Sequence, residues 1–315
     1  MMHSSALNTN QIMRQVIYAL ALGVGVMYYY YGWGVILQIV LAGITALVCE
    51  AAFLKIRKLP ILPAISDGSA LLSAILLAIS IPSIAPWWVV VLGVAFAIVF
   101  GKQLYGGLGN NPFNPAMLGY GFLLISYPVQ MTMWGAEFLS FSQALSIVFE
   151  WNNVDAITAA TRLDEVKTQL MLGLPIVDFS NYAVSQMWVN LGFLFGGLYL
   201  LLRKVILWHI PVAFLVGVVL SSFVVSLGDE SYYLSVQDHL FLGGTMLGAF
   251  FIATDPVSAS TTPNGRLIYG FLIGVLLVVI RVFGNYPDGI AFAVLLMNIT
   301  TPLIDYYTQP KVFGR

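Results

Sequence analysis

Residues 34–54 read GVILQIVLAGITALVCEAAFL, and this run decides the class of fold. Its single charged side chain is Glu50. An α-helix needs about 20 consecutive apolar residues to cross the hydrocarbon core of a bilayer. The run therefore predicts a membrane-spanning helix.

The composition extends this prediction to the whole chain. Of its 315 residues, 59% are apolar and 9% are charged, and the mean hydropathy is +0.89. A soluble domain carries roughly 25% charged residues, so the values exclude a soluble enzyme and a disordered chain. They also exclude nucleic acid as a partner, because binding it requires a basic surface. We expect an all-α integral membrane protein in contact with the lipid bilayer.

Ten apolar segments follow one another along the chain. They are residues 15–31, 34–54, 68–84, 86–102, 116–133, 188–203, 210–227, 238–254, 267–283 and 289–305. About ten transmembrane helices are therefore expected, although the third and fourth segments are short enough to be re-entrant. We divide the chain into a first membrane half (1–133), a loop region (134–187) and a second membrane half (188–315). The loop region is where we expect a small extramembrane element. Each half has five helices.

The distribution of Lys and Arg orients these helices, because cytoplasmic loops carry an excess of both. With a cytoplasmic N-terminus, ten basic residues fall on the cytoplasmic side: Arg14, Lys55, Arg57, Lys58, Lys102, Arg203, Lys204, Arg266, Lys311 and Arg315. Three fall on the other side: Arg162, Lys167 and, near a helix end, Arg281. We expect both termini in the cytoplasm and the loop 134–187 on the outer, periplasmic face.

A faint internal repeat favours a five-plus-five arrangement. The apolar segments that follow Asp67 and Asp238 align, and the turn GNNP (109–112) corresponds to the turn GNYP (284–287). The corresponding segments are five helices apart, so the two halves would have opposite orientations in the membrane. Inverted repeats of this kind place binding sites at the interface between the repeats.

Residues that could bind a metal or an ion are few. The one cysteine, Cys49, excludes an intrachain disulfide or an iron–sulfur cluster held by this chain alone. The three histidines, His3, His209 and His239, have no metal-ligand spacing, so no metal site is expected. Six acids near membrane edges are either interfacial or candidates for ion coupling. They are Glu50, Asp67, Asp238, Asp255, Asp288 and Asp305.

The loop region contains the sequence DAITAAT, residues 155–161. The plain interpretation is a helix start in which Asp155 or Thr158 forms the cap. The functional interpretation is that the small residues before Thr161 leave its hydroxyl accessible to a modifying enzyme. The same spacing recurs in DPVSAST, residues 255–261, which the charge distribution places in the cytoplasm.

A second segment, KQLYGGLGNNPFNPA (102–116), has amides and Gly/Pro breaks between two apolar runs. Its amides could hydrogen-bond a flat polar ring at the membrane face, and its glycines would let the backbone approach that ring. The alternative is a tight reversal between two helices. The segment is no dinucleotide fingerprint, because it lacks the required strand–helix context.

Several long stretches resemble a known family. They are IPSIAPWWVVVLG (81–93), KQLYGGLGNNPFNPAMLGY (102–120), ISYPVQMT (125–132), TMLGAFFIATDPVSASTT (245–262), YPDGIAFAVLL (286–296) and PLIDYYTQPKV (302–312). On these residues, the chain resembles over its full length the RnfD (RsxD) family of membrane subunits of Rnf electron-transport complexes. That family is related to the NqrB subunit of the sodium-pumping NADH:quinone reductase.

The resemblance implies a flavoprotein. In this family a flavin transferase attaches FMN through a phosphoester to the threonine of the pattern Asp-x-x-Ser/Thr-x-Ala-Thr. Asp155, Thr158 and Ala160 match that pattern, so Thr161 is the implied FMN acceptor. Many members have Pro after the acceptor, where this chain has Arg162.

The resemblance also separates the two matching motifs. The transferase acts on the outer face, which favours Thr161 over Thr261. A second, non-covalent flavin (riboflavin or FMN) is implied near the cytoplasmic side, with residues 106–115 as its candidate lining.

The implied function is electron relay in the bacterial inner membrane, in a complex that couples electron transfer between NADH and a low-potential carrier to cation transport. Implied partners are the other Rnf subunits, including a second covalent-FMN subunit and iron–sulfur membrane subunits. The alternatives are a ten-helix solute transporter or channel without flavin, and a structural scaffold. Bound flavin distinguishes the relay from the transporter.

Overall fold

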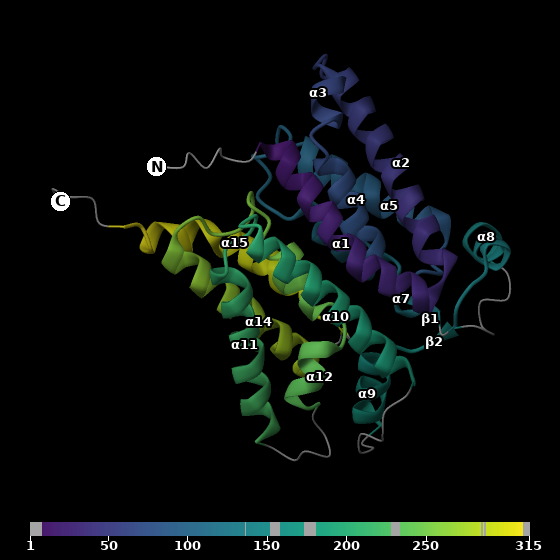
Figure 1. The fold of residues 1–315 in the computed structure, drawn as a ribbon, viewed down its shortest axis with the longest axis vertical. Coiled ribbons are helices and arrows are strands. Elements are labelled where there is room, and N and C mark those ends of the chain that lie inside the picture. Colours follow the sequence, from purple (N-terminus) through teal and green to yellow (C-terminus); the bar gives the residue numbers. More distant parts are fainter. Residues whose placement is uncertain are drawn as a thin grey trace.

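The computed structural model describes residues 8–135, 137–151, 158–172, 181–227, 234–284, 286 and 288–310. Apart from one two-stranded ladder, β1 with β2, and an isolated bridge, the regular structure in these ranges is helical. Each of the ten apolar segments contains a helix (Figure 1). The expected all-α membrane class is therefore confirmed.

The helices fall into two sets that flank the loop region. The first set is α1 (Thr9–Tyr31), α2 (Trp33–Ile56), α3 (Ile61–Ile65), α4 (Ser69–Ser80), α5 (Trp87–Ile98), the π-helix η1 (Val99–Gln103), α6 (Pro115–Ser126) and α7 (Pro128–Thr132). The second set is α10 (Asn181–Leu202), α11 (His209–Ser226), α12 (Val236–Phe241), α13 (Thr245–Leu247), the π-helix η4 (Gly248–Ile252), α14 (Pro263–Phe283) and α15 (Ile290–Tyr307).

Not every expected span is one continuous helix. In the described ranges, six helices are long and apolar enough to cross a membrane: α1, α2, the Val184–Leu202 part of α10, α11, α14 and α15. The segments 116–133 and 238–254 are each divided into shorter helices. The first divides at Tyr127, before Pro128, which has no N–H to continue the hydrogen bonding of the helix, and the second divides at Gly243, where φ is +62°.

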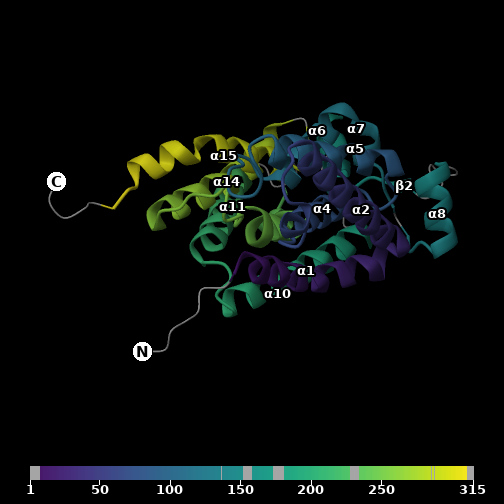
Figure 2. The same ribbon diagram turned by 90° about the horizontal axis from the view of Figure 1, so that it is seen from above.

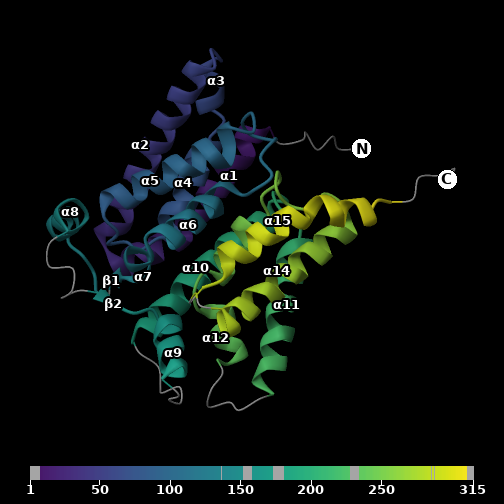
Figure 3. The ribbon, with the colours of Figure 1, turned by 180° about the vertical axis from the view of Figure 1, so that it is seen from behind.

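The two helix sets meet along α1 and α10, which lie side by side (Figures 1 and 2). A second contact joins α6 to α15 on the opposite side (Figure 3). Helices at corresponding positions pack in corresponding pairs, because α2 packs on α5 and α5 on α6, while α11 packs on α14 and α14 on α15. The five-plus-five inverted repeat and the division into domains stay predictions.

The described part of the loop region forms short strands and helices. It contains β1 (Trp134–Gly135), α8 (Phe141–Glu150), β2 (Thr158–Ala159) and α9 (Arg162–Met171). β1 and β2 pair in antiparallel fashion, and α8 packs on α2. The pairing brings the start of α9 back to the helix bundle.

Asparagines repair the breaks in the buried helices. The Asn190 amide donates to the carbonyls of Phe241 and Gly243, each at 2.9 Å, and its oxygen accepts from the N–H of Met246 at 3.1 Å. These three bonds bridge the gap between α12 and α13. Backbone groups left open in a bilayer cost several kcal/mol each. Asn190 satisfies three of those at the break, while Arg281 donates to the carbonyls of His239 and Leu242 and Asp288 accepts from the N–H of Gly244.

A buried ion pair joins three helical elements of the first half. Lys102 on η1 donates to Glu50 on α2 and, at 2.6 Å, to the hydroxyl of Ser69 on α4. The Gln103 amide also donates to Glu50, at 2.7 Å. The expectation that Lys102 lies in a loop is therefore wrong. Its ammonium instead lies within the protein, against a carboxylate from another helix.

Removing one residue of the ion pair should reveal the free-energy cost of burying the other charge alone. Lys102→Met leaves the Glu50 carboxylate buried without its cation, which costs about 3–5 kcal/mol. We expect a clear loss of thermal stability in detergent, with a smaller loss when Glu50→Gln accompanies it. The control is Lys55→Met, which removes an exposed cation from the same end of the bundle. Equal stability of the two single variants would contradict the assignment.

The close contact between α11 and α14 depends on glycines. A Cβ atom placed on Gly274 would lie 2.2 Å from the carbonyl oxygen of Phe214 and 2.8 Å from the amide nitrogen of Val218. Both atoms belong to the α11 backbone, which cannot rotate away. Small residues allow this close approach of membrane helices.

Gly274→Val should therefore separate α11 from α14, with a loss of about 1–3 kcal/mol from overpacking. Gly25→Val is the matched control, because no heavy atom lies within 4 Å of the Cβ position on Gly25. Thermal unfolding in detergent compares the two. A Gly274→Val protein as stable as the control would show that the helix contact is looser than described.

Candidate functional site: two cavities between the membrane halves

Two cavities lie between the halves, at opposite ends of α1. The loop-side cavity, of about 100 Å³, is lined by Met27, Tyr31 and Thr161, among others. The terminus-side cavity, of about 270 Å³, lies near Ile12 and Met13 at the start of α1. Helices of both halves line each cavity, which is the position where inverted repeats bind ligands.

Thr161 is placed in the loop-side cavity by the connection from β2 to α9. Its side chain is only 7% exposed. The hydroxyl donates to Oδ2 of Asp164 at 2.7 Å and accepts from the backbone N–H of Asp164 at 3.2 Å. This is the arrangement of a helix N-cap. The expectation that small residues leave this hydroxyl accessible is wrong, because the capped start of α9 is buried at the wall of the cavity.

The other residues of the 155–161 motif have different surroundings. Thr158 lies in β2 opposite Gly135. The expectation that Thr158 caps a helix is wrong, because the helix begins at Arg162 and Thr161 caps it. Ala160 is exposed, and Asp155 lies outside the described residues.

α9 is seated on the second half of the protein. Nζ of Lys167 donates to the carbonyl of Tyr286 at 2.9 Å and to that of Arg281, in the last turn of α14, at 3.4 Å. The last carbonyls of a helix have no partner within it, and a lysine there is favourable. Leu163 packs against Leu242. Because β2 is paired with β1, the segment that carries Thr161 contacts both halves.

The loop-side cavity is acidic. The carboxylates of Asp164 and Asp288 line it, and no Lys or Arg is among the described residues that do. Burial raises the pKa of Asp164, an effect that hydrogen bonds from Thr161 and the charge of Lys167 partly offset. Burial also lowers the pKa of Lys167. Arg162 is buried and pairs with Glu165 at 3.5 Å.

Aromatic rings and amides contribute to the loop-side wall, beside aliphatic side chains such as Met27 and Leu247. The rings belong to Tyr31, Tyr120, Trp134 and Phe193, and the amides to Gln186 and Asn190. Oε1 of Gln186 is buried and has no hydrogen-bond partner within the described ranges. An unpaired buried acceptor costs free energy, so this oxygen is available to a donor on a ligand.

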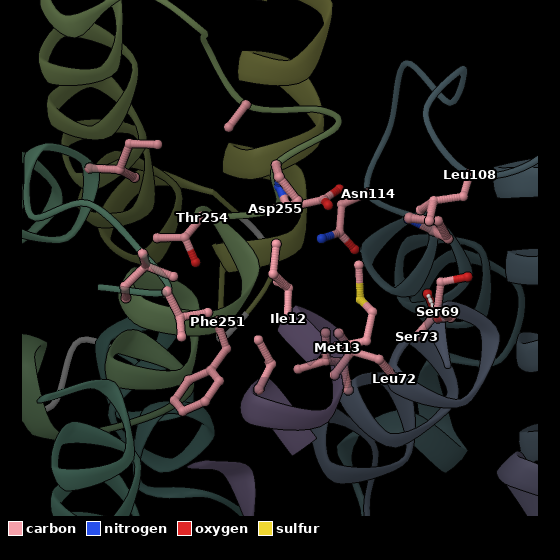
Figure 4. Close-up of a pocket in the computed structure, with 18 of the residues that line it drawn as sticks. Ile12, Met13, Ser69, Leu72, Ser73, Leu108, Asn114, Phe251, Thr254 and Asp255 are labelled. Carbon is pink, nitrogen blue, oxygen red and sulfur yellow. Dashed lines mark hydrogen bonds between the residues drawn. The ribbon is translucent and has the colours of Figure 1, made fainter. Parts of the chain in front are cut away.

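The amide-rich segment 102–116 forms part of the wall of the terminus-side cavity. Leu108, Asn111, Asn114 and Pro115 line it, and the labelled side chains of Asn114 and Asp255 lie close together in Figure 4. Oδ1 of Asn111 is buried without a partner in the described part of the chain. Two of the amides that the sequence analysis singled out thus face a cavity, and one has a free acceptor.

The second copy of the hydroxyl motif lies across this same cavity. Asp255 and Thr261 both line it. The Thr261 hydroxyl donates to Oδ2 of Asp305 at 2.8 Å, and its residue is exposed. Thr161 and Thr261 therefore occupy opposite ends of the protein, although the local spacing of their motifs is the same.

Several residues that build the site were not predicted from the sequence. Asn190 repairs the α12–α13 break and lines the loop-side cavity, and Gln186 supplies the unpaired acceptor. Asn298 accepts from the N–H of Asn114 at 3.0 Å. A polar side chain inside an apolar run was the available signal, because such a group requires a partner. The described residues contain no group of three His, Cys, Asp or Glu that could hold a metal ion.

Comparison with known proteins identifies the family. A sequence model of the NQR2, RnfD, RnfE family matches residues 2–314. A relative from Klebsiella pneumoniae (strain 342) is 51% identical over 97% of this chain and 95% of its own length. A relative from Yersinia pseudotuberculosis serotype O:1b (strain IP 31758) is 52% identical over 98% of this chain and 95% of its own.

Both relatives are named as a subunit of an ion-translocating oxidoreductase complex. A third relative with the same name, from Erwinia tasmaniensis, is 49% identical over 98% of this chain and 94% of its own length. The similarity spans both helix sets and the loop region between them. The chain therefore belongs to the NQR2, RnfD, RnfE family.

Proposed function

We propose that this chain is a membrane subunit of an ion-translocating oxidoreductase complex of the Rnf type, and that it relays electrons through two flavins. The family match over residues 2–314 and the names of the relatives support the assignment to such a complex. The main support for the relay is the position of Thr161, which lies at the edge of one of two cavities between the halves.

The first flavin is an FMN that is joined to the Thr161 oxygen through a phosphoester. The apolar lining of the loop-side cavity, which includes four aromatic rings, suits a flat ring, and the free oxygen of Gln186 suits a ring N–H. Ligand pockets usually measure about 300–1,000 Å³, so the loop-side cavity of about 100 Å³ would enclose only part of the ring. Thr161 is an anchor without a catalytic role of its own.

The second flavin binds without a covalent bond in the terminus-side cavity. Its volume of about 270 Å³ is close to the lower end of the usual range. Asn111 offers an unpaired acceptor, and Asn114 brings a second amide to the wall. A flavin supplies one- and two-electron chemistry, while the protein supplies position and electrostatics.

The two cavities suit a relay between the two sides of a membrane. With both termini in the cytoplasm of a bacterium, the terminus-side cavity faces the cytoplasm and Thr161 the periplasm, across the inner membrane. A flavin transferase modifies the chain from the periplasm. Electrons pass between this chain and the other subunits, including a second covalent-FMN subunit and iron–sulfur membrane subunits. The complex couples transfer between NADH and a low-potential carrier to cation transport.

A ten-helix solute transporter or channel is the second candidate, because cavities between paired halves are the binding sites of transporters. The two candidates differ in one measurable property. The relay predicts a yellow protein with bound flavin, and the transporter predicts a colourless one.

Thr161→Ala should abolish covalent flavin, because the acceptor oxygen is gone. The measurements are in-gel fluorescence after denaturation and the intact mass of the purified chain, which should fall by one FMN group. Thr261→Ala is the matched control, since the same motif spacing precedes Thr261. A fluorescent band that persists in Thr161→Ala would contradict the assignment of Thr161 as the FMN acceptor.

Asn111→Leu should lower the amount of non-covalent flavin that copurifies, because it removes the free acceptor and adds an apolar side chain to the wall. Asn110→Leu is the control, since Asn110 is exposed and does not line the cavity. Flavin released by denaturation, measured per chain, reports the result. Equal occupancy in both variants would place the second flavin elsewhere.

A further inference from the structure

We propose that Asp164 is the base that accepts the hydroxyl proton of Thr161 when FMN is attached, so that this chain supplies a catalytic group for its own modification. This inference rests on the proposed function of Thr161 as the flavin acceptor. It assigns to Asp164 a role beyond that of closing the first turn of α9.

The geometry is that of an activated nucleophile. The Thr161 hydroxyl donates its hydrogen to Oδ2 of Asp164 at 2.7 Å, within the range expected for a base in contact with the proton it takes. At the same time the hydroxyl oxygen accepts from the N–H of Asp164 at 3.2 Å. The pair is therefore held from two directions. A hydroxyl is a weak nucleophile until an adjacent base removes its proton.

The pair is local, which matters because Thr161 is nearly buried. A transferase can reach the hydroxyl only if α9 moves away from the second half, to which Lys167 binds through the carbonyls of Arg281 and Tyr286. Residues 161 and 164 lie within one helical turn, so their contact survives any movement that keeps the start of α9 helical. Asp164 therefore moves together with the Thr161 hydroxyl.

The step balances with a flavin dinucleotide as the donor. Oγ1 of Thr161 forms a bond to the phosphorus of the FMN unit, while the phosphoanhydride bond to the second nucleotide breaks. The leaving nucleoside monophosphate keeps the bonding electron pair, and the hydroxyl proton passes to Oδ2 of Asp164. No group is oxidised or reduced. The N–H groups at the start of α9 are favourably placed for the phosphate charge.

The surroundings keep the Asp164 carboxylate a stronger base than an exposed one, since burial raises its pKa. The charged and titratable groups that act on it lie on several elements. They are Lys167 on α9, Tyr120 on α6 and Asp288 before α15, with Arg281 of α14 bound to Asp288. Among the acids of this turn, Glu165 makes a different contact, with Arg162.

The experiment follows covalent flavin incorporation into the full-length chain. The chain is purified in detergent from cells that lack the transferase, and then mixed with purified transferase and the flavin dinucleotide. Asp164→Glu and Asp164→Gln are the decisive pair, because Glu and Gln at this position both complete a capping box and only Glu is a base. Glu165→Gln is the control for the loss of one negative charge in the same turn.

We expect Asp164→Gln to react about 100-fold more slowly, the size of a general-base effect. Asp164→Glu should keep most of the rate, and Glu165→Gln should match the unmodified sequence. The rate for the unmodified sequence should rise with pH as the Asp164 carboxyl loses its proton, and Asp164→Gln should lack that rise. Hydrogen exchange of α9 should be the same in Asp164→Glu and Asp164→Gln.

Equal rates for Asp164→Gln and Asp164→Glu would overturn the role of Asp164 and leave Thr161 as the acceptor. Slow reaction of both, together with lost protection of α9, would show a purely structural role and would overturn it as well. No incorporation into the unmodified sequence, under conditions where the transferase modifies another substrate, would instead refute the proposed function.

Discussion

The bilayer imposes one requirement on which the rest of this structure depends: a polar group at membrane depth needs a partner within the protein. The backbones of long helices such as α2 and α14 meet the requirement by themselves. The broken span α12–α13–η4 does not, and its open backbone groups bond to Asn190 on α10, Arg281 on α14 and Asp288. Asn114 does the same at the other end of that span, where its amide donates to the carbonyl of Ile252 at 3.3 Å.

The same two asparagines line the two cavities. Asn190 belongs to the wall of the loop-side cavity and Asn114 to that of the terminus-side cavity. This follows from the geometry of a break, because a helix that ends inside the bundle leaves space beside its end. Repairing the backbone and forming a binding cavity are therefore two results of one arrangement. The α9 segment completes the loop-side cavity, since β2 ties it to the first half and Lys167 ties it to the second.

Individual elements show which properties a sequence can predict. The apolar run 34–54 predicted a helix that the structure confirms. The binding of a flat polar ring by the amides of 102–116 stays a prediction, and the structure places two of them, Asn111 and Asn114, in the wall of a cavity. The loop position of Lys102 was predicted wrongly, because its burial depends on Glu50, a residue distant in the sequence. Thr158 was expected to cap a helix, yet strand pairing with Gly135 holds it instead.

The sequence by itself determined the all-helical membrane class, the place of the loop region and the residues that carry the family resemblance. The membrane class and the place of the loop region in the sequence follow from local composition, because transfer of a segment into a bilayer depends on the sum of its own side chains. Only the tertiary structure decided that Lys102 meets Glu50, that Asn190 repairs a distant break, and that Thr161 faces a cavity with Asp164 at its hydroxyl. Whether a polar group is satisfied depends on which other elements reach it, and that is set by packing between helices rather than by the order of residues within one.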